Sequence, residues 1–94
     1  MISNEVDDWI RGRNEEALLA DGFEDAFLGM SEVFGRPSLA TYDKDKCIEI
    51  LMTRDSMTEE EAMEYFDFNV SGSWVGDSTP IYLTLWNKDE QVGS

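Results

Sequence analysis

The side chains of this chain that could do chemistry are mostly carboxylates, because it contains no histidine and a single cysteine, Cys47. Without imidazole there is no histidine general base, no Ser-His or Cys-His nucleophile pair and no histidine-ligated zinc or iron site. Cys47 lies on the apolar stripe of a predicted helix between acidic residues, and both burial and nearby carboxylates raise the pKa of a thiol. We therefore expect Cys47 to be a core residue, and we expect no catalytic residue in the chain.

Neighbouring carboxylates occur along the whole sequence, as expected where 21 acidic residues face seven basic ones. A catalytic carboxylate pair of the glycosidase type must flank its substrate in a cleft. A chain of 94 residues rarely encloses one. We interpret the pairs as solvated surface, and an enzyme stays a minor alternative.

One stretch resembles the first half of a calcium-binding loop. Residues 67–72 (DFNVSG) match the D-x-N-x-S-G pattern of an EF-hand. The twelfth position is Ser78, where EF-hands use a glutamate that supplies two ligand oxygens. A predicted helix also continues through Asn69. We therefore expect no metal site and no cofactor, with calcium binding as a minor alternative.

The formal net charge of −14 is the strongest compositional signal. Such a surface repels nucleic acid and anionic membranes and attracts basic proteins, so we expect a basic protein partner and no direct contact with nucleic acid or membrane. Binding of a basic partner through this charge requires that the carboxylates gather on one side of the molecule. We expect its densest part, and the binding of the partner, at Glu49, Glu59, Glu60, Glu61, Glu64 and Asp67.

The cysteine count and the first residues of the chain indicate the cellular compartment in which we expect the protein. One cysteine cannot form an intramolecular disulfide, which fits a reducing compartment. Residues 1–8 contain neither the basic region nor the apolar stretch of a signal peptide, and every apolar run is far shorter than a membrane span. We expect the protein in the cytoplasm.

These residues must be positioned by one small domain, spanning 1–94 with loose ends at 1–5 and 88–94. Hydrophobic residues make up 41% and aromatic residues 12%, which is enough for one core. We expect an α+β fold in which a small antiparallel sheet packs against an αα-hairpin. Residues 1–22 are predicted to form a peripheral N-terminal helix, capped by Ser3 or Asn4 and stopped at Gly22.

The predicted sheet combines a β-hairpin over about 26–42 with a strand over 81–86. Gly35-Arg36-Pro37-Ser38 supplies the turn of the hairpin. The apolar spacing of residues 23–34 also fits a helix, which stays open. In the strand over 81–86, Tyr82 and Trp86 lie on the face opposite the aliphatic residues. They are either core residues or contacts to a partner or a second copy, and we include both among the partner-binding candidates.

Residues 43–71 hold the clearest pattern, an αα-hairpin of helices over about 44–54 and 59–71. Asp43 is the predicted N-cap of the first helix, whose apolar stripe includes Cys47. Thr58 and Glu61 form a capping box at the start of the second helix. Its buried face is predicted to consist of Ala62, Tyr65, Phe66, Asn69 and Val70.

Several strings in this region resemble a family of small acidic proteins encoded by bacteriophages and prophages. They are residues 42–52 (YDKDKCIEILM), 57–62 (MTEEEA), 64–70 (EYFDFNV) and 74–76 (WVG) with Thr79-Pro80. The resemblance covers about residues 22–82 and brings no activity and no catalytic residues. It implies a phage-related protein made inside a bacterial cell. Small acidic phage proteins often inhibit host machinery, among them anti-CRISPR proteins and DNA mimics.

Two functional hypotheses follow. The leading one is a non-catalytic inhibitor whose acidic surface occupies the nucleic-acid-binding site of a basic host protein, such as a CRISPR effector or another defence factor. The alternative is an oligomeric accessory or scaffold protein, a homodimer among the forms considered, that associates through Tyr82, Trp86 and the strand edge. In that case the acidity only keeps the protein soluble.

Overall fold

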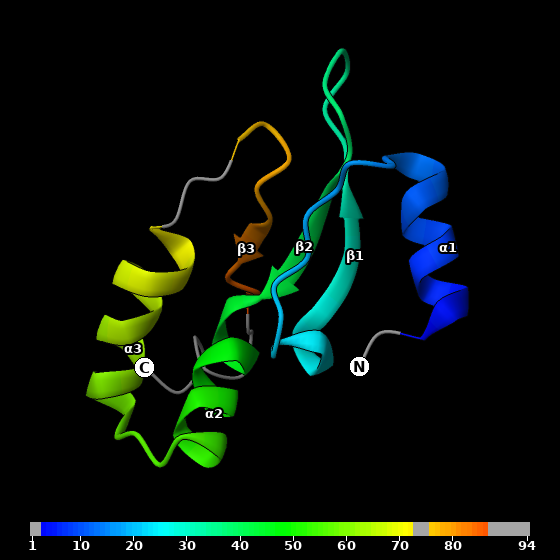
Figure 1. Ribbon diagram of the computed structural model, residues 1–94. Helices are drawn as coiled ribbons and strands as arrows, with labels where there is room; N and C mark the ends of the chain where they lie inside the picture. The colour runs from blue at the N-terminus through cyan, green and yellow to red at the C-terminus, as the bar shows by residue number, and fades with distance from the viewer. Residues whose placement is uncertain (1–2, 73–75, 87–94) are drawn as a thin grey trace.

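The computed structural model describes residues 3–72 and 76–86. The fold is α+β, as predicted: a three-stranded sheet in the order β1-β2-β3 lies between the N-terminal helix α1 and the paired helices α2 and α3 (Figure 1). None of the helices in the described ranges is long and apolar enough to cross a membrane.

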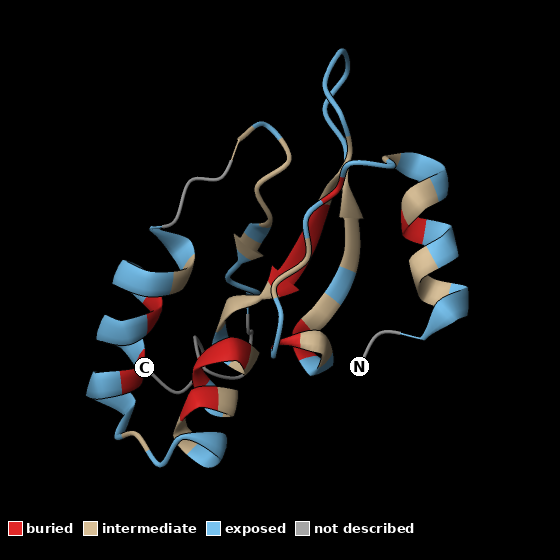
Figure 2. Ribbon diagram, viewed as in Figure 1, coloured by how far each residue is buried: buried red, intermediate tan, exposed pale blue. Residues whose placement is uncertain are grey.

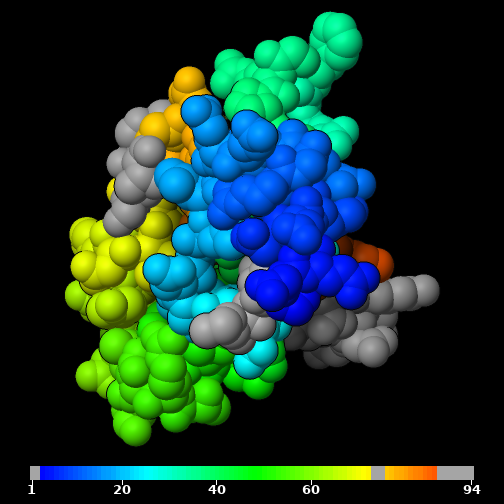
Figure 3. All heavy atoms as spheres, turned by 45° about the vertical axis from the view of Figure 1, so that its right-hand side comes forward, coloured from blue at the N-terminus to red at the C-terminus, as the bar shows by residue number. Residues whose placement is uncertain are grey.

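Helix α1 (Asn4–Arg13) begins as predicted, because the Ser3 hydroxyl accepts a hydrogen bond from the Val6 N–H at 3.2 Å. The predicted continuation to residue 22 is wrong. The Asn14 side chain accepts from the Glu16 N–H at 3.0 Å and donates to the Ser38 carbonyl at 2.9 Å. These bonds offer the backbone an alternative to the next helical turn. Residues 14–22 instead run across the sheet as an irregular segment (Figure 1), which lies at the surface beside α1 (Figure 3).

The predicted hairpin is confirmed. β1 (Phe27–Ser31) and β2 (Leu39–Asp43) pair antiparallel, with Met30 opposite Ala40 and a bulge between Phe27 and Gly29. The helical alternative for residues 23–34 is wrong, and the segment contains only the short 3-10 turn η1 (Glu24–Ala26) before β1.

Strand β3 (Ile81–Leu83) is shorter than the predicted 81–86 and pairs with β2 in parallel, with Tyr82 opposite Tyr42. The antiparallel prediction is therefore wrong for this pair. The two strands are parallel because the connection between them is long: α2 and α3 return the chain to the end of the sheet where β2 began. Parallel neighbours need such a crossover, whereas antiparallel neighbours can be joined by a tight turn.

The αα-hairpin is confirmed as α2 (Lys44–Arg54) and α3 (Glu59–Phe66), and α3 continues into a π-helical turn, η2 (Asp67–Ser71). Both predicted N-caps are present. The predicted buried face of the second helix is only partly right, since Tyr65 and Asn69 are exposed. A π-helical turn contains one more residue than an α-helical turn. It therefore rotates the residues after Phe66 out of the stripe that 3.6-residue spacing predicts.

The core lies where the helical hairpin meets the sheet, and Figure 2 shows its buried residues along β2 and the inner sides of α2 and α3. The ring of Tyr82 packs edge-on against Phe66, with 4.9 Å between ring centroids, and lies 5.9 Å from Tyr42. The Tyr42 hydroxyl accepts from the Ala20 N–H at 2.8 Å. This bond holds residues 14–22, which we call the crossing segment, against the sheet.

Cys47 is fully buried in this core, as predicted. Burial, followed by the nearby Asp43 carboxylate, raises the pKa of its thiol to about 11. Of the ends predicted to be loose, residues 4–5 belong to α1, and residues 1–2 and 88–94 lie outside the described residues.

Candidate functional site

Helix α3 presents carboxylates on the side that faces solvent. Its buried residues, Ala62 and Phe66, are four positions apart and therefore lie on one side of the helix. Glu60 and Glu64 are also four apart, on the opposite side, and both are exposed. The helix therefore separates the core from two adjacent negative charges.

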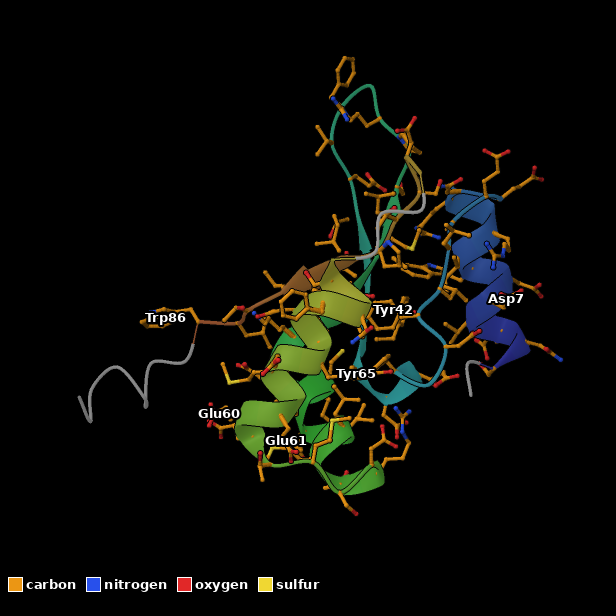
Figure 4. All side chains as sticks on the ribbon, turned by 60° about the vertical axis from the view of Figure 1, so that its left-hand side comes forward. Asp7, Tyr42, Glu60, Glu61, Tyr65 and Trp86 are labelled. Carbon is orange, nitrogen blue, oxygen red and sulfur yellow. The ribbon has the colours of Figure 1, made fainter. Side chains whose placement is uncertain are left out.

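An exposed aromatic ring lies beside these charges. Phe68, in η2, is 76% exposed and lines a shallow hollow of about 380 Å³ together with Glu61 and Glu64. Figure 4 shows Glu60 and Glu61 at the start of α3, on the outside of the molecule. We call the residues Glu60, Glu61, Glu64 and Phe68 the α3 outer face.

Glu61 also has a structural role. Its carboxylate accepts from the Thr58 N–H at 2.9 Å, while the Thr58 hydroxyl accepts from the Glu61 N–H at 3.2 Å. The hydrogen bonds from Thr58 hold the pKa of the Glu61 carboxyl below its usual value. Glu61 therefore stays charged to lower pH than an ordinary glutamate, but its orientation is set by the helix start.

Two of the predicted binding carboxylates are paired with lysines. Glu49 lies 3.4 Å from the Lys46 ammonium, and Asp67 lies 3.8 Å from that of Lys44. Exposed pairs of this kind contribute about 0–1 kcal/mol to stability, but each reduces the local charge. Within residues 3–72 and 76–86, no cation lies within 4.0 Å of the carboxylates of Glu60 and Glu64.

A second group of the predicted carboxylates meets elsewhere. Glu49 from α2 and Glu59 from α3 line a hollow of about 510 Å³ between the two helices, which reaches Thr84 just after β3. We call this hollow the α2–α3 groove. The six predicted carboxylates therefore do not form one patch, because Glu61 and Glu64 line a different hollow.

The two predicted aromatic contacts have different surroundings. Tyr82 is partly buried against the core and also lines a hollow of about 540 Å³, and burial raises the pKa of its hydroxyl to about 12. Trp86, beyond the end of β3, is 73% exposed and points away from the body of the molecule (Figure 4). Trp86 is therefore the more accessible of the two side chains to a partner.

The acidic charge does not gather on one side, contrary to our expectation. Exposed carboxylates occur on α1, on the crossing segment, at the hairpin turn and before β3. They belong to Glu5, Asp8, Glu15, Glu16, Asp21, Asp25, Glu32 and Asp77. Exposed aromatic rings also occur elsewhere, at Trp9 on α1 and at Phe34 in the turn of the β-hairpin. The α3 outer face combines an exposed ring, Phe68, with two carboxylates, Glu60 and Glu64, that lie one helical turn apart and have no cation within 4.0 Å among the described residues.

Sequence reasoning missed the exposed apolar residues of this hairpin. Met63 is 46% exposed, Tyr65 42% and Phe68 76%. The spacing of Phe68 was a usable signal, because a residue two positions after the buried Phe66 points to another side of the helix. The exposure of Tyr65 was not predictable in the same way, since its spacing from Ala62 fits the buried stripe.

The described residues contain no group of three or more His, Cys, Asp or Glu side chains that could hold a metal ion. The half-motif of a calcium loop over residues 67–72 is helical through Ser71, and Asp67 faces Lys44. A calcium loop folds its first, third and fifth side chains around one ion, which a helical segment does not do.

Comparisons with known proteins find no matching family model, no similar curated protein and no similar solved structure.

Proposed function

We propose that the protein acts without catalysis, by binding a basic protein through the α3 outer face. The observation that supports this is the combination on α3 of two exposed carboxylates, Glu60 and Glu64, with the exposed ring of Phe68. Large aromatic side chains often anchor interfaces, and surrounding charges select the partner.

The overall charge supports the same partner class. A net charge of −14 creates a negative potential around the whole molecule, which attracts a basic protein and speeds its encounter. The carboxylates on the other elements take part in this long-range attraction. The α3 outer face then supplies the short-range contacts that decide orientation.

The proposed biological role is inhibition of a nucleic-acid-binding or defence protein in the cytoplasm of a bacterial host. Its support is the resemblance of residues 22–82 to phage-encoded acidic proteins, together with the charge. Basic proteins that bind nucleic acid owe much of their affinity to contacts between Lys or Arg and phosphates. Because the charge of the whole molecule is not gathered on one side, we limit the proposed mimicry of DNA to the carboxylates of the α3 outer face, which can occupy some of the same cations.

Affinity capture from a bacterial lysate tests the proposal. Three tagged baits are compared: the wild-type chain, a Glu60→Lys/Glu64→Lys variant, and a Glu5→Lys/Asp8→Lys variant on α1. Both variants change the net charge from −14 to −10, since two acids become two lysines. We expect a basic protein to be retained by the wild type and the α1 variant and lost from the α3 variant. Equal retention by both variants contradicts the assignment to α3.

The apolar end of the sheet favours a second candidate, self-association. Leu83 is 43% exposed, Leu85 47% and Trp86 73%, and among the residues that the structure describes β3 pairs with a strand on one side only. An edge strand presents unpaired backbone groups that can pair with another chain. An oligomeric accessory protein would use this edge, and its charge would serve solubility.

A further inference from the structure

We propose that the α2–α3 groove holds a lysine side chain of the basic partner, with the aliphatic stem on the floor and the ammonium at the rim. This inference rests on the proposed function, because it names how the same partner is recognised. The groove is distinct from the α3 outer face, so the two can be tested separately.

The floor of the groove is apolar. Ile48 and Met52 of α2 and Met63 of α3 line it, and Met63 is 46% exposed. Methionine side chains are flexible and polarisable, and they adapt to the shape of an incoming group. This floor suits the four methylenes of a lysine, which bury readily while the charged end stays near water.

The rim of the groove is acidic. Asp45 and Glu49 of α2 and Glu59 of α3 line it, so carboxylates come from both helices. An ammonium has three N–H donors and no acceptor, which matches a rim of acceptors on different sides. The volume of about 510 Å³ lies in the range of sites that hold small ligands, so a single long side chain fits.

The lysines of this protein do not already fill that position. Lys44 lines the groove, but its ammonium lies 3.8 Å from Asp67 and 5.7 Å from the centre of the Phe66 ring. The ammonium of Lys46 forms an ion pair with the carboxylate of Glu49 at 3.4 Å. Among the described residues, Asp45 and Glu59 have no ion-pair partner, so the rim retains negative charge for an external cation.

Varying the length of the aliphatic stem in a basic side chain distinguishes binding in this groove from general attraction between charges. The probes are three short peptides that alternate glycine with one basic residue: lysine, ornithine or diaminobutyric acid. All three carry the same charge, but the side chain shortens by one methylene at each step. We expect affinity, measured by calorimetry, to fall about fourfold for each methylene, the factor that corresponds to about 0.8 kcal/mol per buried CH₂.

Variants locate the effect. Met63→Ser removes part of the apolar wall, so the difference between the three peptides should shrink toward equal affinity. Asp45→Asn/Glu59→Gln should weaken the lysine peptide most. The matched control, Glu5→Gln/Asp8→Asn on α1, removes the same charge outside both proposed binding surfaces and should leave the stem-length dependence intact. Circular dichroism confirms that each variant is folded.

The outcomes separate the two proposals. Equal binding of the three peptides to the wild-type protein overturns the groove and leaves the proposed function standing. Stem-length dependence that disappears in the Glu5→Gln/Asp8→Asn control, and persists in Met63→Ser, also overturns the groove. If none of the peptides binds at low salt, both proposals fail.

Discussion

Gly72 ends the helical hairpin at a point where no side chain fits. A Cβ placed on it would lie 2.6 Å from the Asp67 carbonyl oxygen and 3.2 Å from that of Phe68, both of which belong to backbone that cannot move aside freely. Overpacking of this kind typically costs about 1–3 kcal/mol. Glycine at position 72 is therefore required by the close return of the chain after the π-helical turn.

Replacing Gly72 with alanine should lower the free energy of unfolding by about 1–3 kcal/mol in urea titrations. Gly12 provides the matched control, because it lies inside α1 and a Cβ there meets nothing within 4 Å. Gly12→Ala should stabilise the protein by up to about 1 kcal/mol, since alanine favours the helix. Equal destabilisation by both substitutions would contradict the close contact at Gly72.

Glu61 makes a prediction about pH. Its pKa is lowered in the folded state, mainly by the hydrogen bond that its carboxylate accepts from the Thr58 N–H. A lowered folded pKa means that its contribution to stability is fully present above the unfolded value of about 4.3 and is lost as pH falls through the folded pKa. Glu61→Gln should therefore be less stable than the wild type at neutral pH, and the difference should shrink in acid.

Thermal unfolding of Glu61→Gln and Glu64→Gln between neutral pH and the acid limb tests this point. Glu64 has no capping bond and serves as the control. A pH-independent difference between Glu61→Gln and the wild type would show that the capping bond does not depend on the charge of Glu61.

Among the elements, those specified by local contacts were predictable and those specified by distant contacts were not. Asp43 and Thr58 cap their helices through bonds that span three residues, so the starts of α2 and α3 could be predicted. The end of α1 depends on a bond from Asn14 to Ser38, 24 residues away. The parallel pairing of β3 depends on the whole crossover, and the π-helical turn has no sequence signal that we recognise.

The edge at β3 is the element on which self-association depends. Each copy carries a charge of −14, which opposes association at low ionic strength, where charges are poorly screened. We expect sedimentation to show a monomer in low salt and an association that grows as salt is added. Leu83→Lys should abolish this association.

Leu28→Lys is the control for that experiment, because Leu28 is similarly exposed on the other edge strand, β1. Association in high salt that survives Leu83→Lys would place the contact elsewhere. A monomer at every salt concentration would remove the second candidate function.

At the scale of the whole molecule, the amount of charge is counted from the sequence, whereas our prediction that the charge gathers on one side was wrong. The number of carboxylates follows from composition, but their placement follows from which sides of each element are buried. The six predicted carboxylates fall into the α3 outer face, the α2–α3 groove and a pair with Lys44. The spacing of Phe68 from the buried Phe66 could have predicted its exposure, whereas the exposure of Tyr65 depends on how α3 packs.

The scattered carboxylates have a consequence for binding. The scattered carboxylates attract a basic partner at long range, and salt screens this attraction over about 10 Å at 0.1 M. A contact face adds a short-range attraction that depends on where its charged residues lie. A binding site on α3 therefore predicts two separate effects, a general loss of affinity with salt and an additional loss when the charge on α3 itself is reversed.

The most direct measurement is the affinity of the captured basic protein as a function of salt for the wild type, Glu60→Lys/Glu64→Lys and Glu5→Lys/Asp8→Lys. We predict that affinity falls with salt for all three. At every salt concentration the α3 variant should bind at least about tenfold more weakly than the α1 variant of equal net charge, a factor that corresponds to about 1.4 kcal/mol. Equal affinities for the two variants, or an affinity of the wild type that does not change with salt, would contradict an acidic binding face on α3.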